Sequence, residues 1–211
     1  MNTFKWLLKR EYWENRGGFL WAPIVVGGIT VLFSAVASVA GAMMARENLH
    51  EVSREGSAAE MAEHSAQLGG MGDALLASGV SIAFAVMAFV IFFYALGSLY
   101  DDRRDRSILF WKSMPITDAQ MVLSKAAWAL LLAPLMAVGI GLLIGVVLWM
   151  VALMGSAASG VPGFTSIVTH SHPFKVLATL LATLPVQVMW SLPTVGWLML
   201  CSAWARRLPF L

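Results

Sequence analysis

The chain has 211 residues, of which 59% are hydrophobic and only 12% are charged. Soluble domains carry about 25% charged residues, so this composition excludes an ordinary soluble protein and indicates a membrane protein. Fourteen basic and 12 acidic residues leave a net charge of +2, which provides no basic patch for binding nucleic acid. The single cysteine, Cys201, excludes an intramolecular disulfide and a cysteine-cluster metal site.

The first predicted element is an amphipathic helix over residues 2–16, within a leading segment 1–18. Four apolar residues recur there at helical spacing and share one face: Phe4, Leu7, Leu8 and Tyr12. Such a helix suits the inner membrane interface, where lysine and arginine meet anionic lipid headgroups. The alternative is a plain anchor for the first span, and the two interpretations differ only in whether a partner touches the helix.

Four uncharged runs follow, at residues 19–45, 74–99, 126–154 and 176–205. Each exceeds the roughly 20 residues that a helix needs to cross the hydrocarbon. Backbone amides in lipid must be satisfied within their own segment, so each run is predicted to be helical. We therefore predict an all-α fold, a polytopic transmembrane bundle of four spans that forms a single domain over residues 1–211.

Smaller features refine this prediction. Glycine pairs such as Gly141 and Gly145 allow helices to approach closely, which indicates a packed bundle. The stretch Gly155–Gly163 has the composition of a loop. Three prolines lie inside apolar runs and are predicted to kink or break their helices: Pro134, Pro185 and Pro193.

The basic residues indicate the orientation. Eleven of the 14 lie in the leading segment, in the second connection (100–125) and in the tail, and three lie in the other two connections. By the positive-inside rule both termini are cytoplasmic, in what we expect to be the inner (plasma) membrane of a bacterium.

No Asp, Glu, Lys, Arg or His lies inside the four runs, which argues against ion-coupled carriers and intramembrane proteases. The sequence contains no phosphate-binding glycine loop and no specific nucleophile set. His170 and His172 lack a third metal ligand beside them. We therefore predict a non-catalytic protein with no cofactor and no metal.

The connection 100–125 carries the most information. Asp101/Arg104 and Asp102/Arg106 are spaced to form salt bridges along one helix. An apolar knob, residues 108–111, and a proline break at Pro115 come next, and Thr117 with Gln120 predicts a capping box that starts a new helix. An exposed Phe–Trp pair needs cover, either in a partner's groove or in the membrane interface.

These residues resemble a known family. The segments Tyr100–Asp105, Phe110–Pro115 and Ser124–Lys125, together with the amphipathic N-terminal helix, are similar to the permease subunits of ATP-binding cassette exporters of the second type. The resemblance implies a coupling helix in the loop 100–125, seated in a groove of a separate ATPase subunit that hydrolyses ATP. It also implies a homo- or heterodimer of permeases and a membrane domain of six spans, so the chain is expected to end two spans short.

The expected function is thus a permease subunit that moves an apolar or amphipathic substrate. The expected ATPase-coupling residues are Asp101, Asp102, Arg103, Arg104, Asp105, Arg106, Ser107, Leu109, Phe110, Trp111, Lys112, Ser113, Met114 and Pro115. Phe110 and Trp111 are expected to be the desolvated anchor. The alternative is a structural or assembly membrane protein whose loop recruits a cytoplasmic partner without transport.

Overall fold

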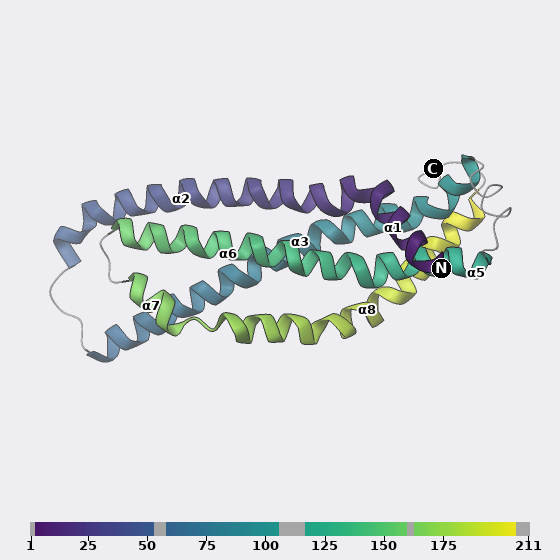
Figure 1. The fold of residues 1–211 in the computed structure, drawn as a ribbon. Coiled ribbons are helices and arrows are strands. Elements are labelled where there is room, and N and C mark those ends of the chain that lie inside the picture. Colours follow the sequence, from purple (N-terminus) through teal and green to yellow (C-terminus); the bar gives the residue numbers. More distant parts are fainter. Residues whose placement is uncertain (1–2, 53–57, 106–116, 160–162, 206–211) are drawn as a thin grey trace. The chain divides into compact units, whose positions relative to one another are not determined.

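A computed structural model describes residues 3–52, 58–105, 117–159 and 163–205 (Figure 1). Over these ranges the chain is helical almost throughout and contains no strand, which confirms the all-α prediction. The elements are α1 (Thr3–Arg16), the π-helical turn η1 (Gly17–Trp21), α2 (Ala22–Val52), α3 (Ala58–Arg104), α5 (Asp118–Ala127), the π-helical turn η2 (Trp128–Leu132), α6 (Ala133–Ser159), α7 (Gly163–His170) and α8 (Pro173–Trp204).

Four helical stretches of the described residues are long and apolar enough to cross a membrane: Phe4–Met44, Gln67–Arg104, Asp118–Ala158 and Pro173–Trp204. Each covers one predicted span almost completely. Large apolar side chains stay exposed on them, such as Phe33 at 74% and Trp190 at 80%. Such surfaces are stable only in lipid or against another protein, so the described chain is a membrane protein.

The chain divides into two compact units. The first unit comprises residues 1–23, 84–137 and 183–211, and the second comprises residues 24–83 and 138–182. Three long helices, α3, α6 and α8, therefore contribute one part to each unit. Each unit is described below by itself.

In the second unit, glycines form the contact between α3 and α6. A Cβ atom added to Gly141 of α6 would lie 2.5 Å from Cα of Val80 in α3, and one added to Gly145 would lie 2.5 Å from the carbonyl oxygen of Leu76. Gly79 of α3 contacts the backbone of Gly145 directly. The absence of side chains thus lets the two backbones touch, as the small-residue spacing predicted.

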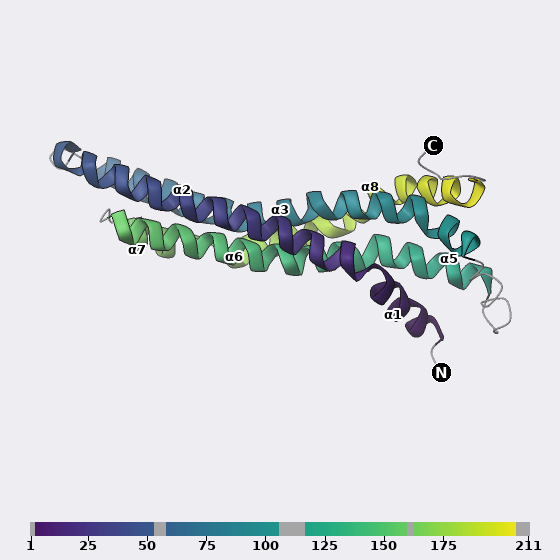
Figure 2. The ribbon, with the colours of Figure 1, turned by 90° about the horizontal axis from the view of Figure 1, so that it is seen from above.

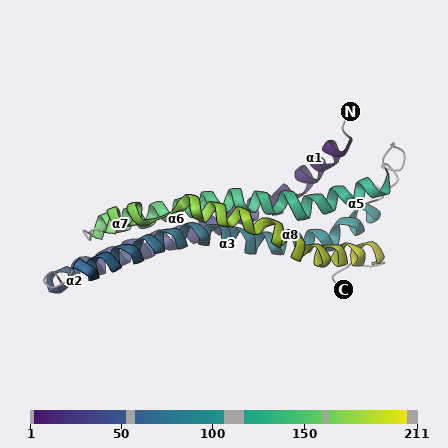
Figure 3. The same cartoon turned by 90° about the horizontal axis from the view of Figure 1, so that it is seen from below.

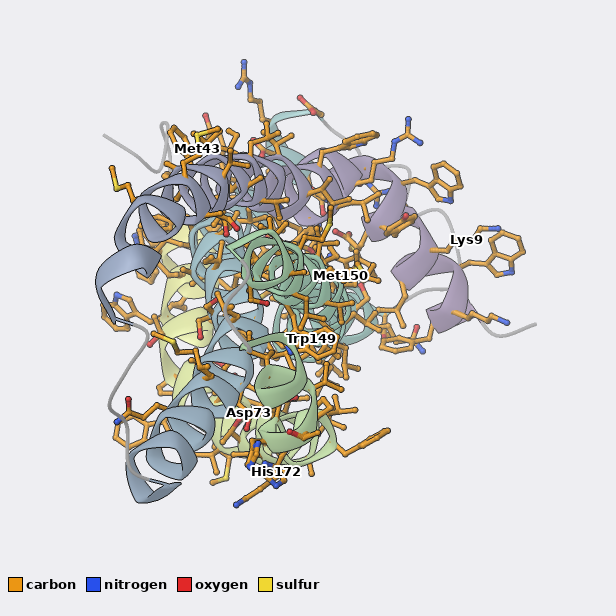
Figure 4. All side chains as sticks on the ribbon, turned by 90° about the vertical axis from the view of Figure 1, so that its left-hand side faces the viewer. Lys9, Met43, Asp73, Trp149, Met150 and His172 are labelled. Atoms are coloured by element: carbon orange, nitrogen blue, oxygen red, sulfur yellow. The ribbon has the colours of Figure 1, made fainter. Side chains whose placement is uncertain are left out.

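Also within the second unit, the first half of α3 contacts the start of α8. The Asp73 carboxylate accepts a hydrogen bond of 2.7 Å from the backbone N–H of His172, one residue before α8 begins. Figure 4 shows the two residues facing each other, with Trp149 of α6 nearby. Asp73 therefore acts as a cap for α8, because it occupies one of the donors that the helix start leaves open.

The first unit is packed on aromatic and small residues. Phe19, Met87 and Trp128 are buried together with Ala133 and Ala137. A second cluster joins α3 to α8, which lie side by side at their C-terminal ends in Figures 2 and 3. There the Ser202 hydroxyl accepts hydrogen bonds from the backbone N–H groups of Leu99 and Tyr100, at 3.1 and 3.0 Å.

Proline shapes two helices of this unit. Each π-helical turn ends two residues before a proline: η1 before Pro23 and η2 before Pro134. A proline has no N–H and its ring pushes away the carbonyl four residues earlier, so the preceding turn widens to the π spacing. The prediction that Pro134 distorts its helix is borne out by η2.

Two sequence predictions are refined. Of the predicted kink or break at Pro185 and Pro193, the break does not occur, because α8 runs without interruption over Pro173–Trp204. In a bilayer, neighbouring helices and local adjustment make an internal proline tolerable. The predicted loop Gly155–Gly163 is helical at both ends, because α6 continues to Ser159 and α7 begins at Gly163.

We predict that Gly145→Leu loosens the contact between α3 and α6. The new side chain would collide with the backbone at Leu76, and overpacking of this kind lowers stability by about 1–3 kcal/mol. Gly139→Leu is the matched control, because a Cβ at Gly139 meets no atom within 4 Å. Thermal unfolding in detergent, followed by fluorescence-detected size exclusion, should rank Gly145→Leu well below Gly139→Leu. Equal stability would contradict the backbone contact.

Candidate functional site

Four charged residues of the first unit meet between three helices. Arg10 and Glu11 come from α1, Asp102 from the end of α3 and Lys125 from α5; we name them the ion cluster. The ammonium of Lys125 lies 3.0 Å from Oε1 of Glu11 and 3.2 Å from Oδ2 of Asp102. Nη2 of Arg10 lies 3.6 Å from Oδ1 of Asp102.

The ion cluster is largely withdrawn from solvent. The exposed fraction of the side chain is 5% for Lys125, 3% for Glu11 and 9% for Asp102. Each of the two buried carboxylates lies beside a cation, which is the condition under which buried charges are tolerated, and Arg10 also pairs with the more exposed Glu14. The second Glu11 oxygen, Oε2, accepts a 2.6 Å hydrogen bond from the hydroxyl of Tyr94 in α3, so both carboxylate oxygens are satisfied.

An aromatic group lies against the ion cluster. Phe19 packs edge-on against Tyr94 and Trp128, with ring centroids 5.2 and 5.6 Å apart, and Tyr12 lies 5.9 Å from Trp128. The buried rings keep water from one side of the charges. A drier surrounding strengthens each ion pair and raises the penalty for breaking one.

The start of α5 positions Lys125. The Thr117 side chain accepts from the backbone N–H of Gln120, and the Gln120 side chain accepts from the N–H of Thr117, both at 3.3 Å. This is the capping box that the sequence predicted. It sets where α5 begins, and Lys125, seven residues after Asp118 of the first turn, faces α1, against which α5 packs.

The predicted apolar face of α1 turns toward its own chain. Leu7 is buried, Leu8 and Tyr12 are half-buried, and only Phe4 is exposed, at 39%. The opposite face carries Trp6 and Trp13, each exposed by more than half and each covered by a cation. Lys9 lies 5.0 Å from the Trp6 ring and Arg16 lies 5.4 Å from the Trp13 ring, and Figure 4 shows Lys9 pointing outward. Contact of α1 with lipid stays a prediction, and this tryptophan–cation face is the one open to it.

The coupling-loop residues divide into two groups. Asp101, Arg103, Arg104 and Asp105 are exposed, and Asp102 is buried in the ion cluster. The remaining predicted residues lie outside the described part of the chain: Arg106, Ser107, Leu109, Phe110, Trp111, Lys112, Ser113, Met114 and Pro115.

Tertiary contacts add ion pairs at this helix end. Asp102 was expected to pair with Arg106, which lies outside the described residues. Within the described residues Asp102 forms ion pairs with Lys125 and Arg10 from other helices. Arg103 donates to the backbone carbonyls of Ser202 and Ala205, at 2.7 and 3.0 Å. It thereby satisfies the open C-terminal carbonyls of α8 and attaches α8 to α3.

Sequence reasoning missed Arg10, Glu11 and Lys125 as members of a site. One signal was available: Glu11 follows Leu7 by four residues and therefore shares the apolar face of α1. An acid on a face that packs against protein needs a cation opposite it. Which lysine or arginine would meet it depended on the tertiary fold.

Comparison with models of protein families, with curated proteins and with solved structures finds no match to this chain. The class that the fold defines is therefore a polytopic all-α membrane protein, and any finer assignment rests on its own residues. Among the described residues, no group of three or more His, Cys, Asp or Glu side chains is placed to hold a metal ion.

We predict that Lys125→Met destabilises the first unit by about 3–5 kcal/mol, because it leaves two buried carboxylates without their shared cation. Adding Glu11→Gln and Asp102→Asn to this variant should restore much of the lost stability, since the buried acids are then neutral and Arg10 keeps its pair with Glu14. Lys5→Met is the matched control, because Lys5 is exposed and belongs to none of the described ion pairs. Thermal unfolding in detergent measures all four proteins, and a Lys125→Met protein as stable as the control would show that the ion cluster is dispensable.

Proposed function

We propose that this chain is the permease subunit of an ATP-binding cassette exporter, driven by a separate ATPase subunit. The resemblance of the 100–125 connection to the coupling loop of that family suggests the assignment. One structural observation supports it: Asp102 and Lys125, which stand near the two ends of this connection, are ion-paired with each other and with α1. A loop held in this way is suited to transmit force.

The mechanical argument follows from these contacts. When two ATPase subunits close, the bound loop is displaced. Because ion pairs join the end of α3, α5 and α1, the displacement would move these three segments together instead of bending the loop alone. Motion would thus reach the spans as a rigid-body input. The loop must bind the open and closed ATPase with different free energies, since equal binding would shift nothing.

Several finer proposals accompany this one. Phe110 and Trp111 would anchor the loop in the ATPase, while exposed Arg104 and Asp105 would contact its surface. Both termini would be cytoplasmic in a bacterial plasma membrane, and two permeases would form a homo- or heterodimer. The uncharged spans favour an apolar or amphipathic substrate.

The assignment predicts that the ATPase is lost when the anchor becomes charged. Stoichiometric ATPase should co-purify with the wild-type chain from its native host, and Phe110→Asp with Trp111→Asp should abolish recovery, because two carboxylates cannot enter an apolar groove. Phe174→Asp is the control: it changes a residue that is 85% exposed, in the connection predicted to face the other side. Tagged purification with quantitative mass spectrometry provides the readout.

Two results would contradict the assignment. An ATPase that stays bound to the double variant would remove the coupling role from Phe110 and Trp111. Stoichiometric recovery of a cytoplasmic partner that is not an ATPase would instead favour the structural or assembly protein.

The orientation predicts opposite labelling of two introduced cysteines, each in a Cys201→Ala background. Asp105→Cys, at the end of α3, should react with a membrane-impermeant maleimide only after the cells are permeabilised. Ser171→Cys, just before α8, should react in intact cells whose outer barrier is open. The reverse pattern would place the 100–125 connection outside the cytoplasm and exclude contact with an ATPase.

A further inference from the structure

A groove of about 500 Å³ opens in the first unit between η1 and α3. One end is polar and is formed by Glu14, Asn15 and Asp101. The other end is apolar and includes Phe19, Val90 and Phe93. Its volume lies in the range of small-ligand sites.

The polar end carries excess negative charge. The cations Arg10 and Lys125 near the groove are already shared among three acids, Glu11, Glu14 and Asp102. Asp101 forms no ion pair among the described residues. Its carboxylate lies beside Gly97, where an added Cβ would be 3.0 Å from Oδ2, so the charge lies on the groove wall.

The groove has room beside Gly17. A Cβ added there would meet no atom within 4 Å, although Gly17 is one of the lining residues. At the neighbouring Gly18 there is no such room, because an added Cβ would lie 3.0 Å from Cγ1 of Val90. The open space thus lies along the π-helical turn itself.

The groove crosses the predicted membrane boundary. Glu14, Asn15 and Asp101 precede or follow the predicted spans, whereas Phe19, Val90 and Phe93 belong to them. A ligand lying along the groove would therefore have its head among lipid headgroups and its tail in hydrocarbon. Phe93 is 53% exposed, so the apolar end is open to lipid.

We propose that this groove binds an amphiphile with a cationic amine head and an apolar tail. The amine would contact the Asp101 carboxylate and the tail would lie against Val90 and Phe93. Two sources supply this chemistry: the ethanolamine headgroup of a membrane phospholipid, and a soluble cationic amphiphile. Binding is a property of the chain itself, so the proposal stands or falls independently of the ATPase.

The test uses the full chain in phosphatidylcholine nanodiscs and a dodecylamine that carries a photoactivatable diazirine on its alkyl chain. Labelling should map by mass spectrometry to segments 14–19 and 90–101. The matching dodecanol probe should label these segments weakly. Asp101→Asn should weaken amine binding about fivefold, the factor that one partly exposed ion pair provides. Asp105→Asn removes an exposed acid near the end of the same helix, outside the groove lining, and should leave labelling unchanged.

A second variant fills the groove without touching charge. Gly17→Leu should reduce labelling by the amine about tenfold, because its side chain occupies the space of the tail. Gly28→Leu is the matched control, since Gly28 is equally open but does not line the groove. Equal labelling by amine and alcohol, or full labelling of Gly17→Leu, would overturn the proposal.

Competition distinguishes the two sources. If phosphatidylethanolamine added to the nanodisc lowers labelling in proportion to its mole fraction, the ligand is the lipid headgroup. If it has no effect while free dodecylamine still competes, the ligand is a soluble amphiphile. Competition by an anionic lipid such as phosphatidylglycerol would contradict the charge argument.

Discussion

One buried ammonium group organises the first unit. Lys125 lies within ion-pair distance of Glu11 from α1 and Asp102 from α3, so three segments far apart in the sequence depend on a single charge. Its burial makes the arrangement demanding, because no water can replace a missing partner. The aromatic rings beside Lys125 exclude solvent, and the capping box at Thr117 fixes the start of the helix that carries this lysine. Removal of the charge should therefore affect the packing of α1 as much as that of α5.

The helices of the two units are held together by different kinds of contact. In the second unit, α3 and α6 touch backbone to backbone through Gly79, Gly141 and Gly145, and dispersion forces carry the contact. In the first unit, helices are joined by the ion cluster, by Arg103 at the end of α8 and by aromatic rings packed edge to face. Lipid tails are as apolar as the helix surfaces, so moving apolar surface from lipid into a helix contact gains no hydrophobic free energy. The contacts in both units therefore depend on close packing, ion pairs and hydrogen bonds.

The two faces of the N-terminal helix α1 make different kinds of contact. Its apolar face, which includes Leu7, packs on the bundle and also holds Glu11 in the ion cluster. Its outer face sets Lys9 over Trp6 and Arg16 over Trp13. A cation over an indole ring is suited to the headgroup layer, where both polar and apolar surroundings are present. The helix is therefore equipped to connect the protein core with the membrane interface.

The sequence alone determined the all-α class, the four spans and the capping box of α5, because length, uncharged composition and local hydrogen bonding need no information from distant residues. It could also mark Gly141 and Gly145 as small but not name Gly79 as their counterpart. Only the tertiary structure decided that Asp102 pairs across to Lys125, that Glu11 joins them and that Asp101 stays on a groove wall. The two ion pairs of Lys125 link residues more than twenty positions apart, and such pairing depends on how helices lie against each other, which no periodicity in one segment encodes.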